Sequence, residues 1–286
     1  MLLELAVGDA YGAGFEYANR HVIRQFNDLK HYHKHPRHRI RPGEYTDDTQ
    51  MTLAITESIL SGETWTPQYL AERFVDVFKR DPREGYASRF YSFLKQVADG
   101  TQFLADIIPT SDKSGAAMRA IPIGIFPNVQ EVIDRAALQA TITHNTPNGI
   151  NAAVAVALMS HYCLYNLGPK NDIGAFIEAH VEGDWADAWR GQVGPKGWMS
   201  VKAAVTAIRS TSRMSDLLRV CIDFSGDVDT VATIALGAAS CSPEFEQDLP
   251  SVLIDGLEAT PYGREYLIKL DKLLHDYRQK LHDLNL

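Results

Sequence analysis

Cysteine is scarce in this sequence. The 286 residues include only Cys163, Cys221 and Cys241. An odd, sparse set is not the disulfide framework of a small secreted domain, and none of the three has the close spacing of a zinc site. The N-terminus carries Glu4 and no basic stretch, which is not typical of a signal peptide. We therefore expect a reducing, cytoplasmic location.

Long hydrophobic runs are also missing. The longest apolar stretch covers residues 152–167, is rich in alanine, and is interrupted by Ser160 and His161. It is too short and too polar to span a membrane, so it is better explained as a buried helix. We expect no contact with a membrane.

Positive charge is in deficit. Lys and Arg number 28 against 36 Asp and Glu, a formal net charge of −8. This balance argues against a protein that coats nucleic acid or anionic lipid through bulk charge. Any anionic ligand must instead be held locally, by helix ends, backbone amides or a metal ion. The overall composition, 45% hydrophobic and 22% charged, is that of an ordinary soluble globular protein.

Alternating strand patterns are absent, and helical periodicity is found instead. Residues 51, 54, 55, 58 and 59 share one helical face, and residues 231, 234, 235, 238 and 239 share another. Further helices are predicted near residues 67–79, 86–98, 130–142, 147–166, 199–210, 214–223 and 262–282. Because no break is long enough for a clear linker, we predict one compact all-α domain over residues 1–286.

Two acidic segments each stand just before a predicted helix. Residues 45–50 read Tyr-Thr-Asp-Asp-Thr-Gln, and residues 225–230 read Ser-Gly-Asp-Val-Asp-Thr. Helix capping explains one such segment well, since Asp and Thr are good N-caps and Asp47 with Gln50 resembles a capping box. A cap needs only one acid, however, and each segment has two.

If the two helix starts converge, four carboxylates meet in one place. Such close like charges would raise one another's pKa, and a bound cation would remove the repulsion. The candidate ligands are all oxygen atoms, which favours Mg²⁺ or Mn²⁺ over zinc. A pair of ions bridged by a shared carboxylate is the natural arrangement for so many acids.

The order of motifs along the chain resembles that of the ADP-ribosylglycohydrolase family. Residues 8–16 read Gly-Asp-Ala-Tyr-Gly-Ala-Gly-Phe-Glu and precede the two acidic segments. Between those segments, residues 114–119, followed by Pro122, look like the family's Asn-Gly-x-x-Met-Arg segment. Residues 143–145, Thr-His-Asn, look like its Thr-His segment. The resemblance runs from Gly8 to about Ala239.

The resemblance implies an all-α orthogonal helical bundle with a central cleft that holds two Mg²⁺ ions. The metal ligands that it implies are Thr46, Asp47, Asp48, Asp227, Asp229 and Thr230. Glu16, Asp47 and Asp48 would be the catalytic residues, with Glu16 beside the substrate ribose. The substrate-binding residues would be Ser111, Ser114, Gly115, Met118 and His144. Ser114 stands where the family usually has Asn, while Ser225 and Val228 depart from its usual Gly and Thr.

The activity that the resemblance implies is hydrolysis of the bond between ADP-ribose and a modified protein side chain, with arginine as the leading acceptor. Hydrolysis of O-linked ADP-ribose, on serine or in poly(ADP-ribose), is one alternative. A non-catalytic ADP-ribose-binding member of the fold is another. The expected partner is an ADP-ribosylated protein or a small molecule that contains ADP-ribose.

A histidine-rich loop precedes the first acidic segment. It contains His31, His33, His35 and His38, interrupted by basic residues and a proline. We interpret it as a solvated loop, with a second metal site as the alternative. The loop could still lie near the cleft. Core packing is the favoured interpretation of Trp185, Trp189 and Trp198, with stacking on adenine as the alternative.

Overall fold

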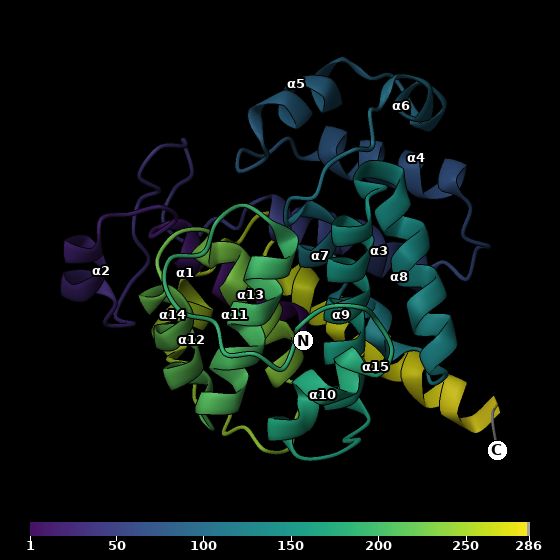
Figure 1. Cartoon of the computed structure of the whole chain (residues 1–286). Coiled ribbons are helices and arrows are strands. Elements are labelled where there is room, and N and C mark those ends of the chain that lie inside the picture. The colour runs from purple at the N-terminus through teal and green to yellow at the C-terminus, as the bar shows by residue number, and fades with distance from the viewer. Residues whose placement is uncertain (285–286) are drawn as a thin grey trace.

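Helices make up the regular structure of this protein. The computed structural model describes residues 1–284, apart from the side chains of residues 282 and 284. Within those residues, β-pairing is limited to isolated bridges, so the all-α prediction is confirmed. The α-helices (Figure 1) are α1 (Leu2–Ala13), α2 (Arg20–Phe26), α3 (Asp47–Leu60), α4 (Pro67–Arg80), α5 (Ser88–Gln96), α6 (Gly100–Asp106), α7 (Gly115–Met118), α8 (Val129–His144), α9 (Pro147–Leu164), α10 (Ile173–Glu178), α11 (Gly197–Ser210), α12 (Met214–Asp223), α13 (Val228–Ala239), α14 (Ser251–Gly256) and α15 (Arg264–Leu284). Two short 3₁₀ helices are η1 (Ile121–Ile125) and η2 (Lys170–Asp172).

The centre of the molecule is a set of helices with small side chains. α13 packs against α1, α9, α11 and α12, and each residue of α13 is buried (Figure 1). α1 approaches α13 closely because glycines face it. A Cβ atom on Gly8 would lie 2.8 Å from the carbonyl oxygen of Ala232, and one on Gly12 would overlap the backbone of Asp229. The start of α13 is therefore fixed against α1.

The alanine-rich stretch forms α9, a helix with nearly all of its residues buried, as the sequence predicts. Among the described residues, no helix is long and apolar enough to cross a membrane. The outer helices have one apolar face, which suits their half-exposed positions. α4, for example, buries Leu70, Phe74 and Phe78.

The predicted helices agree with α3, α4, α5, α8, α9, α11, α12, α13 and α15 to within a few residues at each end. The sequence does not predict the short helices α2, α6, α7, α10 and α14, which have between four and seven residues. A helix of one or two turns has too few residues to show a period of 3.6.

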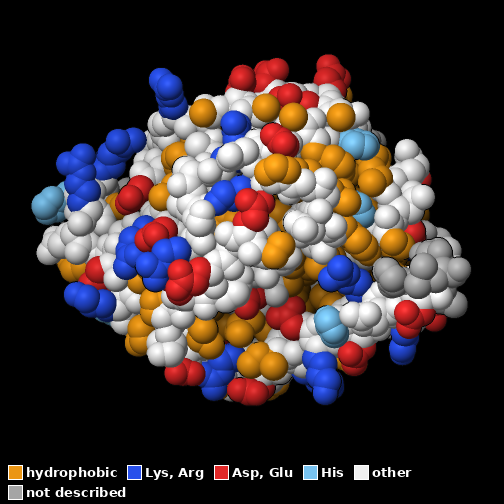
Figure 2. All heavy atoms as spheres, turned by 90° about the horizontal axis from the view of Figure 1, so that it is seen from below, with side chains coloured by type: hydrophobic (Ala, Val, Ile, Leu, Met, Phe, Trp, Pro, Cys, Tyr) orange, Lys and Arg blue, Asp and Glu red, His pale blue; other side chains and the backbone are white. Residues whose placement is uncertain are grey.

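The surface carries both signs of charge, but not evenly. In Figure 2, Lys and Arg side chains gather at the left end, where Figure 1 places α2. Elsewhere on that face, acidic and basic side chains alternate with apolar ones.

Candidate active site

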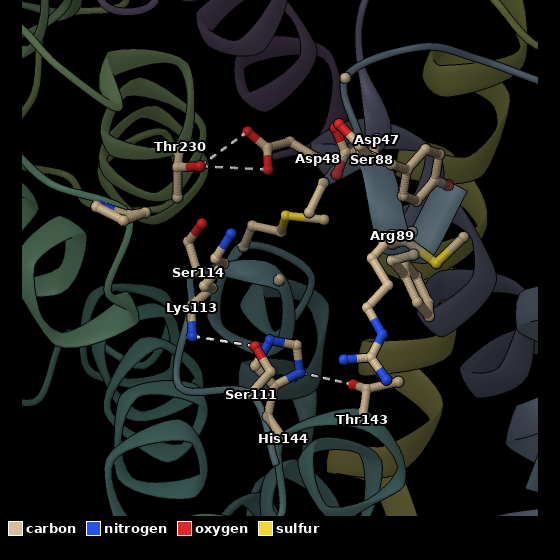
Figure 3. A pocket seen from close by; sticks show the side chains of 18 of the residues that line it. Asp47, Asp48, Ser88, Arg89, Ser111, Lys113, Ser114, Thr143, His144 and Thr230 are labelled. Carbon is tan, nitrogen blue, oxygen red and sulfur yellow. Dashed lines mark hydrogen bonds between the residues drawn. The ribbon is translucent and has the colours of Figure 1, made fainter. Parts of the chain in front are cut away.

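One cavity of about 720 Å³ brings the predicted site residues together. It is bounded by the starts of α3 and α13, by α5, by the loop before α7 and by the end of α8 (Figure 3). The predicted residues that line it are Glu16, Asp47, Asp48, Ser111, Ser114, Gly115, Met118, His144, Asp227, Asp229 and Thr230. The two acidic segments, separated by about 180 residues of sequence, therefore converge on one cavity.

A buried aspartate on α1, part of the motif at residues 8–16 but without a predicted role, organises the first acidic segment. The Asp9 carboxylate accepts hydrogen bonds from the backbone N–H groups of Thr46 (3.0 Å) and Thr49 (2.9 Å) and from both of their hydroxyls. Asp9 thus satisfies the start of α3 from a neighbouring helix. Asp47 and Asp48 are left free of any capping role, so capping does not explain the pair.

Thr46 is the one predicted site residue that does not line the cavity. Its hydroxyl donates to Asp9 (2.8 Å) and accepts from the backbone N–H of Asp48 (3.3 Å), and its side chain is buried. Since a hydroxyl has two lone pairs, one remains for a cation. The predicted ligand role of Thr46 stays a prediction.

The carboxylates meet around Thr230. Its Oγ1 lies 3.3 Å from a carboxylate oxygen of Asp48 and 3.3 Å from one of Asp227 (Figure 3 shows the Asp48 contacts). Carboxylate oxygens of Glu16, Asp227 and Asp229 also lie within 4.8 Å of one another. Oxygen ligands from two helix starts thus surround one small volume.

Burial dominates the electrostatics of this cluster. It raises the pKa of Asp47, Asp48 and Asp229 well above the usual value, and neighbouring carboxylates raise it further. The pKa of Asp227 rises to about 6 for the same reasons. Among the described residues, no Lys or Arg forms an ion pair with any of these four acids. An all-oxygen donor set without a cationic partner fits hard divalent cations such as Mg²⁺.

The histidine-rich loop holds Glu16 in place. His35 is 3% exposed, and its Nε2 lies 2.7 Å from Glu16 Oε2. Its Nδ1 accepts from the backbone N–H groups of Arg37 (3.0 Å) and His38 (2.9 Å), so the ring proton is on Nε2 and is donated to Glu16. Arg37 binds the other Glu16 oxygen at 3.0 Å.

The interpretation of that loop as solvated is wrong for His35, which is buried. The alternative of a second metal site stays a prediction: ligand atoms of Glu16, His35 and His38 lie within 4.8 Å of one another, and His35 Nε2 would have to give up its proton to bind an ion. The expectation that the loop lies near the cleft holds, because Arg37 and His38 line the cavity. Although burial opposes its ionisation, the His35 hydrogen bond and the charge of Arg37 hold the pKa of Glu16 below its usual value.

A second hydrogen-bonded chain fixes His144 at the opposite end of the cavity. Arg119 is fully buried and donates to the Thr143 hydroxyl (2.9 Å), which in turn lies 2.7 Å from His144 Nδ1 (Figure 3). Thr143 therefore donates to Nδ1, and Nε2 carries the proton. Burial, together with the charge of Arg119, lowers the pKa of His144 to about 3. His144 is thus a neutral hydrogen-bond donor.

Several further residues of this end come from α5 and the turn before it, which the motifs do not reach. Tyr86 in that turn and Arg89, Phe90 and Phe93 of α5 line the cavity, whereas Trp185, Trp189 and Trp198 do not. Arg89 is exposed, forms no ion pair among the described residues, and extends into the cavity in the direction of Thr143 and His144 (Figure 3). No sequence pattern sets this arginine apart from the other arginines of the chain.

Comparison with known proteins now decides the family. The model of the family described as ADP-ribosylglycohydrolase matches residues 1–283. The chain belongs to this family. The resemblance in motif order is therefore confirmed, and the names of the family and of curated relatives of this chain are those of ADP-ribosyl glycohydrolase enzymes.

Among its curated relatives in the family, the Xenopus tropicalis "ADP-ribosylhydrolase ARH3" is 30% identical over 189 residues, 62% of this chain and 53% of that protein. The chain spans about half the length of the ARH3 proteins that it matches. The Rhodospirillum rubrum "ADP-ribosyl-[dinitrogen reductase] glycohydrolase" is 25% identical over 278 residues, 95% of this chain and 93% of that protein.

A solved structure titled "ADP-ribosylglycohydrolase-related protein complex" shares the fold. It has a TM-score of 0.73 and 23% sequence identity, and the match covers 97% of this chain and 96% of that one. The all-α fold implied by the resemblance is thus confirmed.

Proposed function

We propose that this protein is a Mg²⁺-dependent hydrolase that releases ADP-ribose from a modified protein side chain, with arginine as the first acceptor to test. The observation that carries the proposal is the convergence of Asp48, Asp227 and Asp229, buried and without a cationic partner, at one end of a 720 Å³ cavity. Burying several carboxylates together costs free energy, because like charges repel and lose their hydration. A bound divalent cation offsets that cost, so the cluster indicates a cation site.

The residues that would hold the metal are Asp47, Asp48, Asp227, Asp229 and Thr230, with Thr46 behind them. Two Mg²⁺ ions, or Mn²⁺ in their place, would offset the carboxylate charge, orient ribose hydroxyls and make a water molecule more acidic. These residues offer only oxygen atoms, the donors that Mg²⁺ prefers, and carboxylate oxygens of Asp227, Asp229 and Glu16 lie within 4.8 Å of one another.

The protein's own groups would then act on the sugar. Cleavage of a glycosidic bond places positive charge on the ribose, and nearby carboxylates stabilise that charge. Glu16 suits this role, since His35 and Arg37 hold both of its oxygens and keep it ionised. Asp47, which is not the N-cap of α3 and lines the cavity, would accept a proton from the attacking water.

The other end of the cavity suits the rest of the ligand. Neutral His144 offers an N–H donor for the adenosine ribose, and the loop at Ser111, Ser114 and Gly115 offers hydroxyl and backbone groups for the diphosphate. Met118 provides an apolar wall beside them. An anionic substrate thus needs no overall basic charge on the protein.

The test is incubation with peptides that carry ADP-ribose on arginine or on serine, with chromatographic detection of released ADP-ribose. We expect release from the arginine-linked peptide in Mg²⁺. Release from the serine-linked peptide alone would support the hydrolase activity but change the acceptor residue from arginine to serine. Release from neither peptide, together with tight binding of ADP-ribose, would overturn the enzymatic proposal in favour of a binding protein.

A further inference from the structure

Positive charge in this acidic protein is concentrated in one short segment. Residues 20–41, here called the basic segment, contain seven Lys and Arg residues and a single acid, Asp28, a formal charge of +6. The remaining residues contain 21 basic and 35 acidic side chains, a charge of −14. The net charge of −8 therefore conceals two regions of opposite sign.

The cations of the basic segment face the solvent. All seven are exposed: Arg20, Arg24, Lys30, Lys34, Arg37, Arg39 and Arg41. Lys30, Arg37 and Arg41 pair with Asp28, Glu16 and Glu44. Within residues 1–284, the side chains of Arg20, Arg24, Lys34 and Arg39 have no carboxylate partner. The gathering of Lys and Arg at the α2 end of the molecule is visible in Figure 2.

The basic segment is an ordered surface, not a loose loop. Asn19 caps α2, and the loop that follows folds back onto it, with the His33 and Phe26 rings 5.4 Å apart. The Tyr32 hydroxyl donates to the carbonyl of Leu253 at 2.7 Å, which ties the middle of the loop to α14. The unpaired cations are thus presented from a fixed backbone.

This surface is continuous with the carboxylate end of the cavity. Arg37 and His38 belong to the segment and also line the cavity, and Arg37 contacts Glu16, whose carboxylate lies beside those of Asp227 and Asp229. In the proposed reaction, the scissile bond lies at that end. The protein that carries the ADP-ribose must therefore leave the cavity there and pass next to the basic segment.

We propose that the basic segment is a docking surface for acidic residues that flank the ADP-ribosylated side chain of the target protein. This inference rests on the proposed function. Complementary charge at the cavity edge would raise the association rate and select targets, because unpaired surface cations attract acidic segments over roughly 10 Å at about 0.1 M salt. An acidic protein surface fits better than a nucleic acid, because the −14 remainder of the chain would repel an extended polyanion.

The test compares fluorescent peptides that carry the same ADP-ribosylated residue between glutamates, between glutamines or between lysines. Each is made with an arginine and with a serine linkage. The readout is the dissociation constant from fluorescence anisotropy, which does not require turnover. We expect the glutamate-flanked peptides to bind about tenfold more tightly than the glutamine-flanked peptides at low salt, and the preference to vanish near 0.5 M salt.

Two matched variants locate the effect. R20Q/R24Q/K34Q/R39Q removes the unpaired cations of the segment, and R190Q/K269Q/K272Q/K280Q makes the same charge change at exposed positions elsewhere. Only the first variant should lose the preference for glutamate flanks, with binding of the glutamine-flanked peptides unchanged. Circular dichroism checks that both variants fold. If either variant fails to fold, the binding preference of the unmodified protein for glutamate over glutamine flanks still tests the proposal.

Equal binding of all three flanks, or an equal loss of preference in both variants, would overturn the docking surface. Tighter binding of a duplex DNA or of poly(ADP-ribose) than of the glutamate-flanked peptides would overturn the assignment to a protein target. A preference for glutamate flanks without any release of ADP-ribose would support the surface and contradict the proposed hydrolysis, so the two failures are distinct.

Discussion

The two ends of the cavity are built in different ways. The carboxylate end comes from the first turns of α3 and α13 and is fastened by buried contacts to α1, through Asp9 and through the close approach at Gly12. The opposite end comes from α5, the loop at 107–115 and the end of α8, and much of it is exposed. The first end is thus held rigidly for chemistry, whereas the second depends on how short and peripheral elements are placed.

The largest expected effect is at the carboxylate end. Asp229→Ala should reduce ADP-ribose release about a thousandfold or more, since it removes a charge aimed at the reacting centre. The far-ultraviolet circular dichroism spectrum should remain that of a helical protein. Asp276→Ala, an exposed acid of α15, is the matched control and should keep full activity. Comparable activity in both variants would remove the carboxylate cluster from the mechanism.

The metal-free protein should lose stability as the pH rises. The folded-state pKa of Asp227, about 6, lies above its ordinary value near 3.8, so the folded state favours the protonated form. The stabilising contribution of protonated Asp227 is fully present below about pH 4 and is lost as the pH rises past 6. The expected loss is about 3 kcal/mol from this group alone, and the raised pKa values of Asp47, Asp48 and Asp229 act in the same direction.

Denaturant unfolding of the EDTA-treated protein at pH 5 and at pH 8 measures this loss, and Mg²⁺ should reverse it at pH 8. A metal-free protein that is equally stable at the two pH values would show that the carboxylates do not repel one another in the fold.

A smaller effect is expected from the histidine that positions Glu16. His35→Ala removes the hydrogen bond to Glu16 and leaves two backbone N–H groups without an acceptor. Activity should fall about ten- to a hundredfold, as is usual for residues that orient a catalytic group. His35→Gln, which keeps a donor and an acceptor, should recover part of it. His21→Ala, at an exposed position of α2, should change nothing. An equal loss in the Ala and Gln variants would assign His35 a purely structural role.

The smallest effect is expected at the opposite end. Arg89→Gln should raise KM about tenfold with little change in kcat, because the guanidinium extends into the cavity and its charge favours a diphosphate. Lys95→Gln, on the same helix but outside the cavity lining, is the control. A fall in kcat with constant KM would instead place Arg89 in the chemical step. The opposite end of the cavity would then contribute to chemistry as well as to binding.

The same contrast explains what can be predicted from the sequence. The long helices follow from periodicity. Paired acids at two helix starts indicate a cation site only if those starts converge, and the convergence of residues 45–50 with residues 225–230 is implied by the family resemblance alone. The role of Asp9 is not predicted. An acid within an apolar helix does not indicate which other helix start accepts its carboxylate as a hydrogen-bond partner. The role of His35 is not predicted, because the surrounding basic residues indicate a solvated loop and the sequence does not show that its ring reaches Glu16.

The α5 side could not be predicted for a different reason. α6 and α7 are too short to show a period, and nothing local tells Arg89 from other surface arginines. Its position depends on how α4, α5 and α6 pack above the rest of the molecule (Figure 1). Tertiary packing, which a single sequence does not display, places the α5 residues of the cavity, whereas Ser111, Ser114, Gly115 and His144 at the same end are implied by the family resemblance.

We propose that the converging carboxylates bind divalent cations that the hydrolysis of ADP-ribosylated peptides requires. The decisive measurement is the rate of ADP-ribose release by the EDTA-treated protein before and after Mg²⁺ is added back. We expect release to be lost in EDTA and restored by Mg²⁺ in the unmodified protein, and not to be restored in Asp229→Ala. Full activity in EDTA would contradict it.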